Sequence, residues 1–283
     1  MKWSDLMDTL IKTGYCTFTL SDDEMACFYE HGLKFPNLYE NEYVLIANSE
    51  NEICDKFVYR DGDLHRISWK PIENKYVGTI RPKNIEQELA LDMLQDKVSQ
   101  VKVLSGTFGS GKDFLMINEA LQRLDSGEFD KLIWVRNNIE VKGVEKLGAL
   151  PGDVYDKVVN FAMPLADHLG GIEMLENYID HGQIEVAHLG YMRGRDIKHS
   201  LIYVSEAENL TTKLCQVLIS RLSNGSQLWM NGDWRQADRE MFESDSGLIK
   251  MINRLSGNPL FGHVYLPHSV RSEAASLADL LDD

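Results

Sequence analysis

A glycine-rich segment that ends in lysine has the residue types and spacing needed to bind the phosphates of a nucleotide. It follows an apolar run, Val101–Ser105, which predicts a strand, and precedes a run that predicts a helix to about Leu124. In such a loop, backbone N–H groups bind phosphate oxygens, glycines let the main chain come close, and the lysine offsets the charge of the outer phosphates. The segment consists of Gly106, Thr107, Phe108, Gly109, Ser110, Gly111, Lys112 and Asp113. It predicts a P-loop for a nucleoside triphosphate; a glycine-rich turn that only joins strand to helix is the alternative.

Two positions that usually bind Mg²⁺ beside such a loop hold other residue types. Asp113 stands where a serine or threonine normally offers its hydroxyl to the metal. A later predicted strand, Leu201–Val204, is followed by Ser205 and Glu206, where an aspartate usually meets the metal's water shell and a glutamate orients the attacking water. We hypothesise that Asp113 and Ser205 have exchanged roles, so that one carboxylate and one hydroxyl still complete an octahedral Mg²⁺ shell. The alternative is a site that hydrolyses poorly or not at all.

Three further segments carry polar side chains suited to a nucleotide site. Asp233 and Gln236 follow a predicted strand and could hydrogen-bond the γ-phosphate or the attacking water, although a capped strand-to-helix turn would look the same. Gln87 lies on a predicted helix before the P-loop, and its amide could pair with an adenine edge, although a lone glutamine is more often helix surface. Arg271, at the start of a predicted closing helix, could reach a phosphate as an arginine finger, in its own site or a neighbour's.

The order of predicted elements indicates an α/β fold with a mostly parallel central sheet. Residues 1 to about 33 predict helices, the second of which starts at Ser21. Glu42–Ala47 and two runs separated by Asp61-Gly62-Asp63 predict a small β-rich segment with a tight hairpin. The other predicted strands are Val101–Ser105, Lys131–Arg136, Gln183–His188, Leu201–Val204, Ser226–Asn231 and, at an edge, His263–Leu266. We therefore divide the chain into a small accessory α+β region, residues 1–78, and a larger domain, residues 79–283.

Composition narrows the class of protein. The 29 basic and 44 acidic residues give a net charge of −15, which disfavours broad adhesion to nucleic acid but leaves room for a local basic groove. Arg193, Arg195 and Lys198 could form such a groove, or could be solvated surface charges. The four cysteines lack metal-ligand or disulfide spacing, and we expect reduced packing residues in the cytoplasm. We expect no membrane span, because no apolar run approaches ~20 residues, and no signal peptide, because Met1–Asp5 lacks its apolar core.

The order of these motifs resembles the PhoH-like ATPases, and most closely the ATPase half of proteins in which a PIN nuclease domain precedes a PhoH domain. The resemblance extends from about Pro36 to the C-terminus, and we expect no PIN domain before it. The family pattern has threonine at 113, aspartate at 205 and glutamine at 208, so Asp113, Ser205 and Glu208 depart from it. The motifs that carry the resemblance are Arg81–Gln87, the P-loop, Leu147–Asp153, Met192–Arg195, Ser205–Asn209, Gly232–Gln236 and Arg271-Ser272.

The resemblance implies a RecA-like P-loop NTPase fold related to superfamily I helicases, ATP hydrolysis with Mg²⁺, and helicase-like remodelling of RNA or single-stranded nucleic acid. It also implies homo-oligomers, such as a hexameric ring, and a phage origin would place the protein in the host cytoplasm. Only one RecA-like core is expected, so unwinding would need neighbouring subunits. The roles carried over by position are adenine contact for Gln87, phosphate binding for Gly106 to Lys112, water orientation for Glu206, γ-phosphate contact for Asp233 and Gln236, and the finger for Arg271.

A second interpretation comes from a different class of protein. The chain would be a nucleotide-binding interaction module whose assembly is controlled by ATP and which hydrolyses little. The altered pair Asp113 and Ser205 and the acidic composition favour this alternative.

Overall fold

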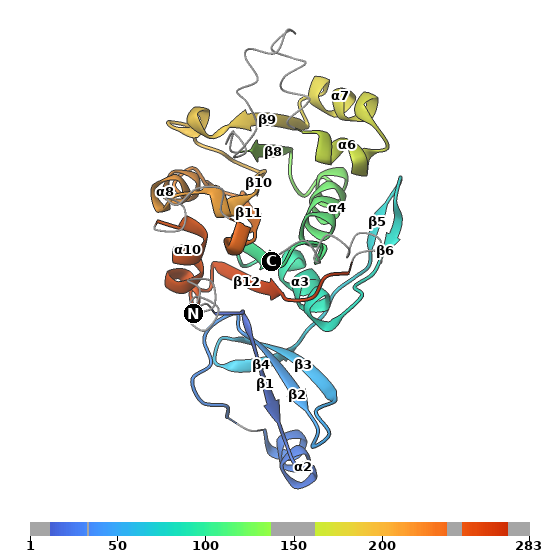
Figure 1. Cartoon of the computed structure of the whole chain (residues 1–283), viewed down its shortest axis with the longest axis vertical. Coiled ribbons are helices and arrows are strands. Elements are labelled where there is room, and N and C mark those ends of the chain that lie inside the picture. Colours follow the sequence, from blue (N-terminus) through green and yellow to red (C-terminus); the bar gives the residue numbers. More distant parts are fainter. Residues whose placement is uncertain (1–11, 33, 137–161, 237–244, 271–283) are drawn as a thin grey trace, which may run out of the picture.

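A six-stranded parallel sheet forms the centre of the larger part of the protein (Figure 1). The computed structural model describes residues 12–32, 34–136, 162–236 and 245–270. The strand order is β12-β7-β11-β10-β8-β9, and every neighbouring pair is parallel. The strands are β7 (Val101–Gly106), β8 (Lys131–Arg136), β9 (Ile184–His188), β10 (Ser200–Ser205), β11 (Gln227–Gly232) and β12 (Phe261–Leu266). All six confirm the strands predicted from the apolar runs, and β12 is an edge strand as predicted.

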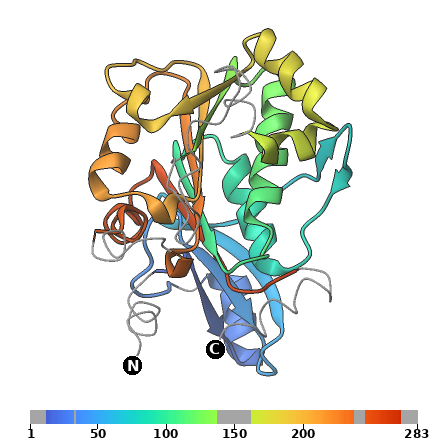
Figure 2. The same ribbon diagram turned by 45° about the horizontal axis from the view of Figure 1, so that its top comes forward.

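Helices cover both faces of this sheet, as Figure 2 shows. One face carries α3 (Ile85–Gln95), α4 (Lys112–Asp125), α6 (Met163–Leu169) and α7 (Ile172–Asp180), and the other carries α8 (Thr212–Ile219) and α10 (Gly247–Leu255). Side chains alternate between the two faces along each strand. Tyr203 belongs to the hydrophobic cluster under α3 and α4, whereas its neighbour Ile202 belongs to the cluster under α8 and α10. This three-layer α/β/α arrangement confirms the predicted RecA-like P-loop NTPase fold.

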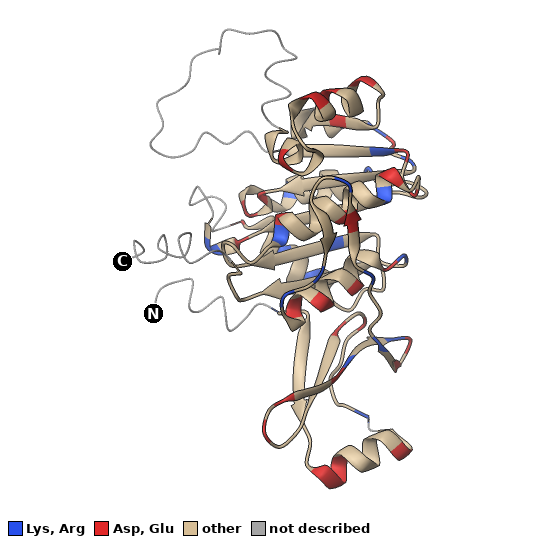
Figure 3. Cartoon of the chain, turned by 90° about the vertical axis from the view of Figure 1, so that its right-hand side faces the viewer, with Lys and Arg blue, Asp and Glu red and all other residues tan. Residues whose placement is uncertain are grey.

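A smaller four-stranded sheet, in the order β1-β2-β3-β4, lies beside the core and carries α2 (Asp22–His31) at its far end (Figure 3). Its strands are β1 (Tyr15–Thr19), β2 (Tyr43–Ala47), β3 (Ile53–Arg60) and β4 (Asp63–Arg66). The hairpin predicted at Asp61-Gly62 joins β3 to β4, and both turn residues have positive φ. The predicted helix start at Ser21 is also confirmed, because Ser21 and Glu24 form a capping box.

The prediction of helix throughout residues 1 to about 33 is wrong between Tyr15 and Thr19. These residues form β1, which pairs in parallel with β2, so that Tyr15 lies opposite Tyr43. The segment Tyr-Cys-Thr-Phe-Thr is rich in aromatic and β-branched residues, and the neighbouring strand supplies the hydrogen bonds that a helix would have made internally. The first predicted helix falls on residues 1–11, outside the described residues.

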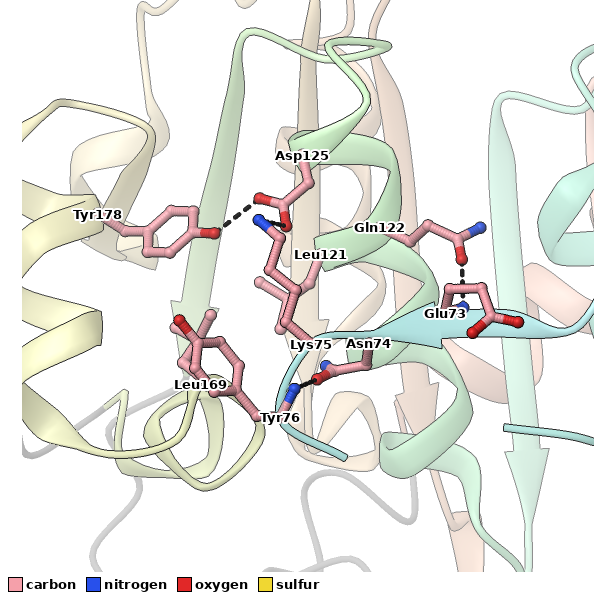
Figure 4. Close-up of a pocket in the computed structure, with 9 residues that line it drawn as sticks. All are labelled: Glu73, Asn74, Lys75, Tyr76, Leu121, Gln122, Asp125, Leu169 and Tyr178. Carbon is pink, nitrogen blue, oxygen red and sulfur yellow. Dashed lines mark hydrogen bonds and ion pairs between the residues drawn. The ribbon is translucent and has the colours of Figure 1, made fainter. Parts of the chain in front are cut away.

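A hairpin of β5 (Ile72–Asn74) and β6 (Gly78–Ile80) crosses the predicted division at residue 78. Figure 4 shows its tip against the carboxyl end of α4: the Lys75 ammonium lies 3.2 Å from Asp125 Oδ2, and the Tyr178 hydroxyl donates to Asp125 Oδ1 at 2.7 Å. The backbone N–H of Glu73 donates to Gln122 in the same helix. The division into two units stays a prediction.

Helix α3 connects the smaller sheet to the core. Carboxylates at four-residue intervals, two in α3 and one at its C-cap, face the sheet: Glu88 pairs with Lys56 at 2.8 Å, Asp92 accepts from the Tyr43 hydroxyl at 2.8 Å, and the C-cap Asp96 lies 3.2 Å from Arg60. Residues four apart share one face of a helix, so one face of α3 and the cap that follows it make these contacts.

Candidate nucleotide-binding site

The P-loop leaves β7 at the carboxyl edge of the parallel sheet and ends at the first turn of α4. Gly106 has φ 153°, and a Cβ there would lie 2.3 Å from the Leu266 carbonyl oxygen, so the close passage beside β12 needs glycine. Gly111 adopts a left-handed conformation with φ 88° directly before α4. Within the described residues no side chain caps the amino end of α4, which leaves its first backbone N–H groups available to an anion.

Lys112 is the electrostatic centre of the site. Its ammonium donates to the carbonyl oxygens of Gly106 at 2.8 Å and Thr107 at 2.9 Å, so it lies across the loop. Burial lowers the pKa of Lys112, and four carboxylates act in the opposite direction: those of Asp233, Asp113, Glu208 and Glu206. These four residues come from the start of α4 and from the segments after β10 and β11. The structure therefore brings the predicted motifs together around one ammonium group.

The P-loop contains a hydroxyl group, that of Ser110, to which no described residue hydrogen-bonds. Ser110 is 1% exposed, and its hydroxyl has no hydrogen-bond partner among the described residues. A buried hydroxyl without a partner is unfavourable, and a phosphate oxygen would satisfy it. Thr107 donates its hydroxyl to the Pro267 carbonyl at 3.1 Å, and Phe108 is half exposed. The free hydroxyl, the uncapped helix and Lys112 together fit a bound polyphosphate.

Gln87, in α3, hydrogen-bonds to the backbone of the P-loop. Its amide nitrogen donates to the Ser110 carbonyl at 3.0 Å, and its amide oxygen accepts from the Lys83 backbone N–H at 2.8 Å. The predicted cap Asn84 starts the helix by accepting from the Gln87 backbone N–H. These two backbone bonds use one N–H and one oxygen lone pair of the Gln87 amide, so an adenine edge would have to meet the second N–H or the second lone pair. That contact stays a prediction.

Asp113 is held by two side chains from the sheet. Its Oδ1 accepts from the Tyr203 hydroxyl at 3.0 Å and from the Asn231 amide. No described residue bonds to Oδ2. Ser205 is buried, and since it is two residues after Tyr203 on β10, its side chain lies on the same face of the sheet as the Tyr203 ring. Asp113 and Ser205 are thus on one side of the sheet.

The carboxylate oxygens of Asp113 and the hydroxyl oxygen of Ser205 are the kind of ligand that Mg²⁺ prefers. Among the described residues, no group of three or more His, Cys, Asp and Glu side chains is arranged to hold a metal ion. A magnesium ion at Asp113 and Ser205 would therefore depend on nucleotide phosphates and water for the rest of its ligands. The exchange of roles between Asp113 and Ser205 stays a prediction.

The segments after β10 and β11 form the acidic side of the site. Glu206 is exposed and has a left-handed backbone with φ 59°, a conformation that L-residues adopt rarely. Glu208 is buried, and its carboxylate accepts from the Asp233 backbone N–H at 3.1 Å. Burial, reinforced by the charge of Glu206, raises the pKa of Glu208 to about 8. Gln236 is exposed and follows Asp233 in a 3₁₀ turn closed by its own N–H on the Asp233 carbonyl.

Two predicted elements fall outside the described residues: Arg271 and the segment Leu147–Asp153. Val270 donates its backbone N–H to the Gly109 carbonyl at 3.0 Å, which brings the chain to the P-loop directly before position 271. The basic cluster is largely paired, because Arg195 lies 2.5 Å from Glu185 and Lys198 lies 3.2 Å from Asp196. For those two cations the structure agrees with the interpretation as balanced surface charges.

The sequence did not identify Tyr203 and Asn231 as site residues. Both lie inside predicted strands, and the only signal was their polar groups near the carboxyl end of apolar runs. In the structure they support Asp113 and, through Asn231 Oδ1, the backbone N–H of Glu206 at 3.3 Å.

The parallel sheet, the P-loop after β7 and the acidic segments after β10 and β11 define a P-loop NTPase. The chain belongs to the PhoH-like protein family, whose model matches residues 79–279. Membership in this P-loop ATPase family supports nucleotide binding by the loop. Within the described part of the chain no helix is long and apolar enough to cross a membrane.

Curated relatives in several bacteria match over different lengths. Protein PhoH2 of Bacillus subtilis is 33% identical over 287 residues, which cover 95% of this chain and 64% of that protein. Protein PhoH2 of Thermobispora bispora is 27% identical over 284 residues, covering 96% of this chain and 63% of that protein. The PhoH-like protein of Synechocystis is 37% identical over 172 residues, covering 60% of this chain and 51% of that protein. The chain thus spans less than two thirds of each of these relatives.

Proposed function

We propose that this chain binds ATP with Mg²⁺, hydrolyses it, and couples hydrolysis to work on RNA or single-stranded nucleic acid. The observation that carries the ATPase part is the gathering of Asp113, Glu206 and Asp233 around Lys112 at the end of the P-loop. A phosphate-binding cation alone would suit many anions, whereas carboxylates beside it are what metal binding and water activation require.

Each candidate site residue that the structure describes has a role in this proposal. The P-loop amides, the Ser110 hydroxyl and Lys112 bind the phosphates, and Glu206 orients the attacking water from its exposed position after β10. Asp233 and Gln236 face the γ-phosphate side, where a hydrogen bond would report whether that phosphate is present. Mg²⁺, when bound through Asp113 and Ser205, would offset the charge of the phosphate oxygens.

Partner and assembly are further parts of the proposal. The family resemblance supports RNA or single-stranded nucleic acid as the partner. It also supports a ring-shaped homo-oligomer in which Arg271 acts as a finger. The protein would work in the cytoplasm, which is that of a host cell if the source is a phage. A single RecA-like core fits a motor that needs neighbouring subunits.

The direct test measures phosphate release from ATP by the full chain, with and without Mg²⁺ and single-stranded RNA. Lys112→Ala and Glu206→Gln should each lower the rate by about 100-fold or more, the usual effect of removing one electrostatic or water-orienting group. Lys213→Ala and Glu173→Gln, both exposed on α8 and α7, are matched controls and should leave the rate unchanged. A parent rate no higher than that of Lys112→Ala would refute the ATPase, equal rates for Glu206→Gln and the parent would refute the role of Glu206, and no response to RNA would remove the nucleic-acid part.

A second candidate function is an ATP-controlled interaction module. The favouring observation is that Lys112 already contacts two loop carbonyls and that Asp113 Oδ1 is already engaged, so the catalytic groups are tied to the protein. Retention of ATP without phosphate release, together with a nucleotide-dependent change of size in solution, would favour this candidate.

A further inference from the structure

Asp113, Tyr203 and Asn231 form a closed triangle of hydrogen bonds beneath the phosphate site. The Tyr203 hydroxyl donates to Asp113 Oδ1 at 3.0 Å, the Asn231 amide donates to the same oxygen, and the Asn231 amide lies 2.8 Å from the Tyr203 hydroxyl. Asp113 lies in α4, Tyr203 in β10 and Asn231 in β11. In the chain, Tyr203 is 90 positions and Asn231 is 118 positions from Asp113. Both donors therefore bond the same carboxylate oxygen, Oδ1, and no described residue bonds Oδ2.

The two donors are rigidly placed. Tyr203 is 0% exposed and Asn231 is 2% exposed. The Tyr203 ring stacks on Trp134 of the adjacent strand, with ring centroids 4.7 Å apart and planes 8° apart. A buried tyrosine hydroxyl or asparagine amide is costly without a partner, so these groups keep their bonds to Asp113. Asp113 itself is exposed at the helix start, and its orientation is set from the sheet.

The triangle of hydrogen bonds is also connected to Glu206, in the segment after β10. Asn231 Oδ1 accepts from the Glu206 backbone N–H at 3.3 Å, where Glu206 has the left-handed conformation. One asparagine side chain thus connects the start of the P-loop helix with the residue proposed to orient water. A shift of Asp113 would therefore move Asn231 and the Glu206 backbone bonded to it, and a shift of Glu206 would move Asp113 through the same side chain.

We propose that Tyr203 and Asn231 are positioning residues that direct Asp113 Oδ2 to the metal, which lets an aspartate serve where the family pattern has threonine. This inference rests on the proposed function. An aspartate free to rotate would place negative charge against the phosphates. Mg²⁺ also accepts ligands only in near-octahedral geometry, so a fixed direction of the oxygen matters. Two neutral donors on Oδ1 fix that direction.

The test measures the affinity for ATP by calorimetry, with Mg²⁺ and with a chelator in its place, in the parent protein and in Tyr203→Phe. The variant loses only a hydroxyl. We expect the gain in affinity that Mg²⁺ provides to fall about tenfold, the size of one hydrogen bond to a charged group, and the affinity in chelator to stay the same. Asn231→Ala should act in the same direction.

The double variant separates positioning from general structure. In an Asp113→Thr background, Tyr203→Phe should have no further effect on the Mg²⁺-dependent gain, because the residue through which it acts is gone. Tyr43→Phe is the matched control: Tyr43 is also buried and its hydroxyl also donates to an aspartate, Asp92, at 2.8 Å. That control should change stability and leave the response to Mg²⁺ intact.

The outcomes discriminate clearly. An equal loss of affinity with and without Mg²⁺ in Tyr203→Phe, or an undiminished effect in the Asp113→Thr background, would overturn the positioning role. If the parent protein retains no ATP under either condition, the proposed function itself fails. If it retains ATP and Tyr203→Phe responds to Mg²⁺ as the parent does, only the positioning inference fails.

Discussion

Glu208 is a buried carboxyl group at a position where the family pattern has glutamine. It accepts a hydrogen bond from the Asp233 N–H, and burial together with the charge of Glu206 raises its pKa from 4.5 to about 8. At neutral pH the protonated carboxyl resembles a glutamine amide in carrying one donor and one acceptor. The folded protein therefore binds a proton that the unfolded chain has released between these two pH values.

This linkage predicts how stability depends on pH. The contribution of Glu208 is fully present below pH 4.5 and is lost as pH rises to about 8, because ionisation is easier in the unfolded chain. Glu208→Gln should remove the dependence, so its free energy of unfolding should rise relative to the parent across that range. Urea unfolding at several pH values measures it, with exposed Glu173→Gln as the control. A constant difference between Glu208→Gln and the parent over this range would contradict the prediction.

The sequence pattern identified the P-loop of the candidate site more readily than the residues that hydrogen-bond to it from other elements. Gly106 to Lys112 were recognisable because the loop's contacts are made by consecutive residues. Tyr203 and Asn231 support Asp113 from other strands, and such pairing depends on the sheet order, which no local pattern shows. Gln87 was predicted to contact adenine, yet its position behind the loop depends on how α3 packs against Ser110.

At the scale of elements, the buried parallel strands were predictable and the small sheet only in part. Strands of a sheet covered on both faces are continuous apolar runs, which the sequence shows directly. Strand β1 is half exposed and depends on pairing with β2, so its five residues gave no comparable signal. The hairpin β5–β6, the helix α7 and the short helices α8 and α10 were not predicted. Their positions depend on packing against the sheet.

Asn41 joins the smaller sheet to the start of β12 and the residues just before it. Its φ is 64°, and its buried amide donates to the carbonyl oxygens of Pro259 and Phe261, each at 3.0 Å. Its amide oxygen accepts from Arg60. Removing the side chain leaves these buried groups without their partner.

Two substitutions at Asn41 should separate its side-chain bonds from its backbone conformation. Asn41→Gly keeps the left-handed backbone conformation without strain. It should lower the free energy of unfolding by about 1–3 kcal/mol, because the side-chain hydrogen bonds are lost. Asn41→Ala should cost about 1 kcal/mol more, because alanine is strained there. Denaturant unfolding measures both. Asn51→Gly, at an exposed residue with φ 63°, is the control and should have little effect; equal effects of glycine at both positions would show that the Asn41 contacts contribute nothing.

At the scale of the whole molecule, the smaller sheet and the core share one hydrophobic cluster. Tyr43, Leu45 and Val58 of the smaller sheet pack in the same cluster as Leu89 of α3 and Leu104 of β7. The same boundary carries the Asp92 and Asp96 contacts described above. An accessory region attached in this way should lose stability when the core opens, since its inner face packs in a cluster that it shares with the core.

We therefore predict that β2 and β7 unfold in one cooperative step. Native-state hydrogen exchange, followed by mass spectrometry at increasing urea, should give the amides of both strands the same free energy of opening and the same dependence on urea. Val58→Ala should lower both values together, because it opens a cavity in the shared cluster. If β2 opened at lower urea while β7 stayed protected, the region before residue 78 would be an independent unit, and the shared cluster would be too weak to couple it to the nucleotide site.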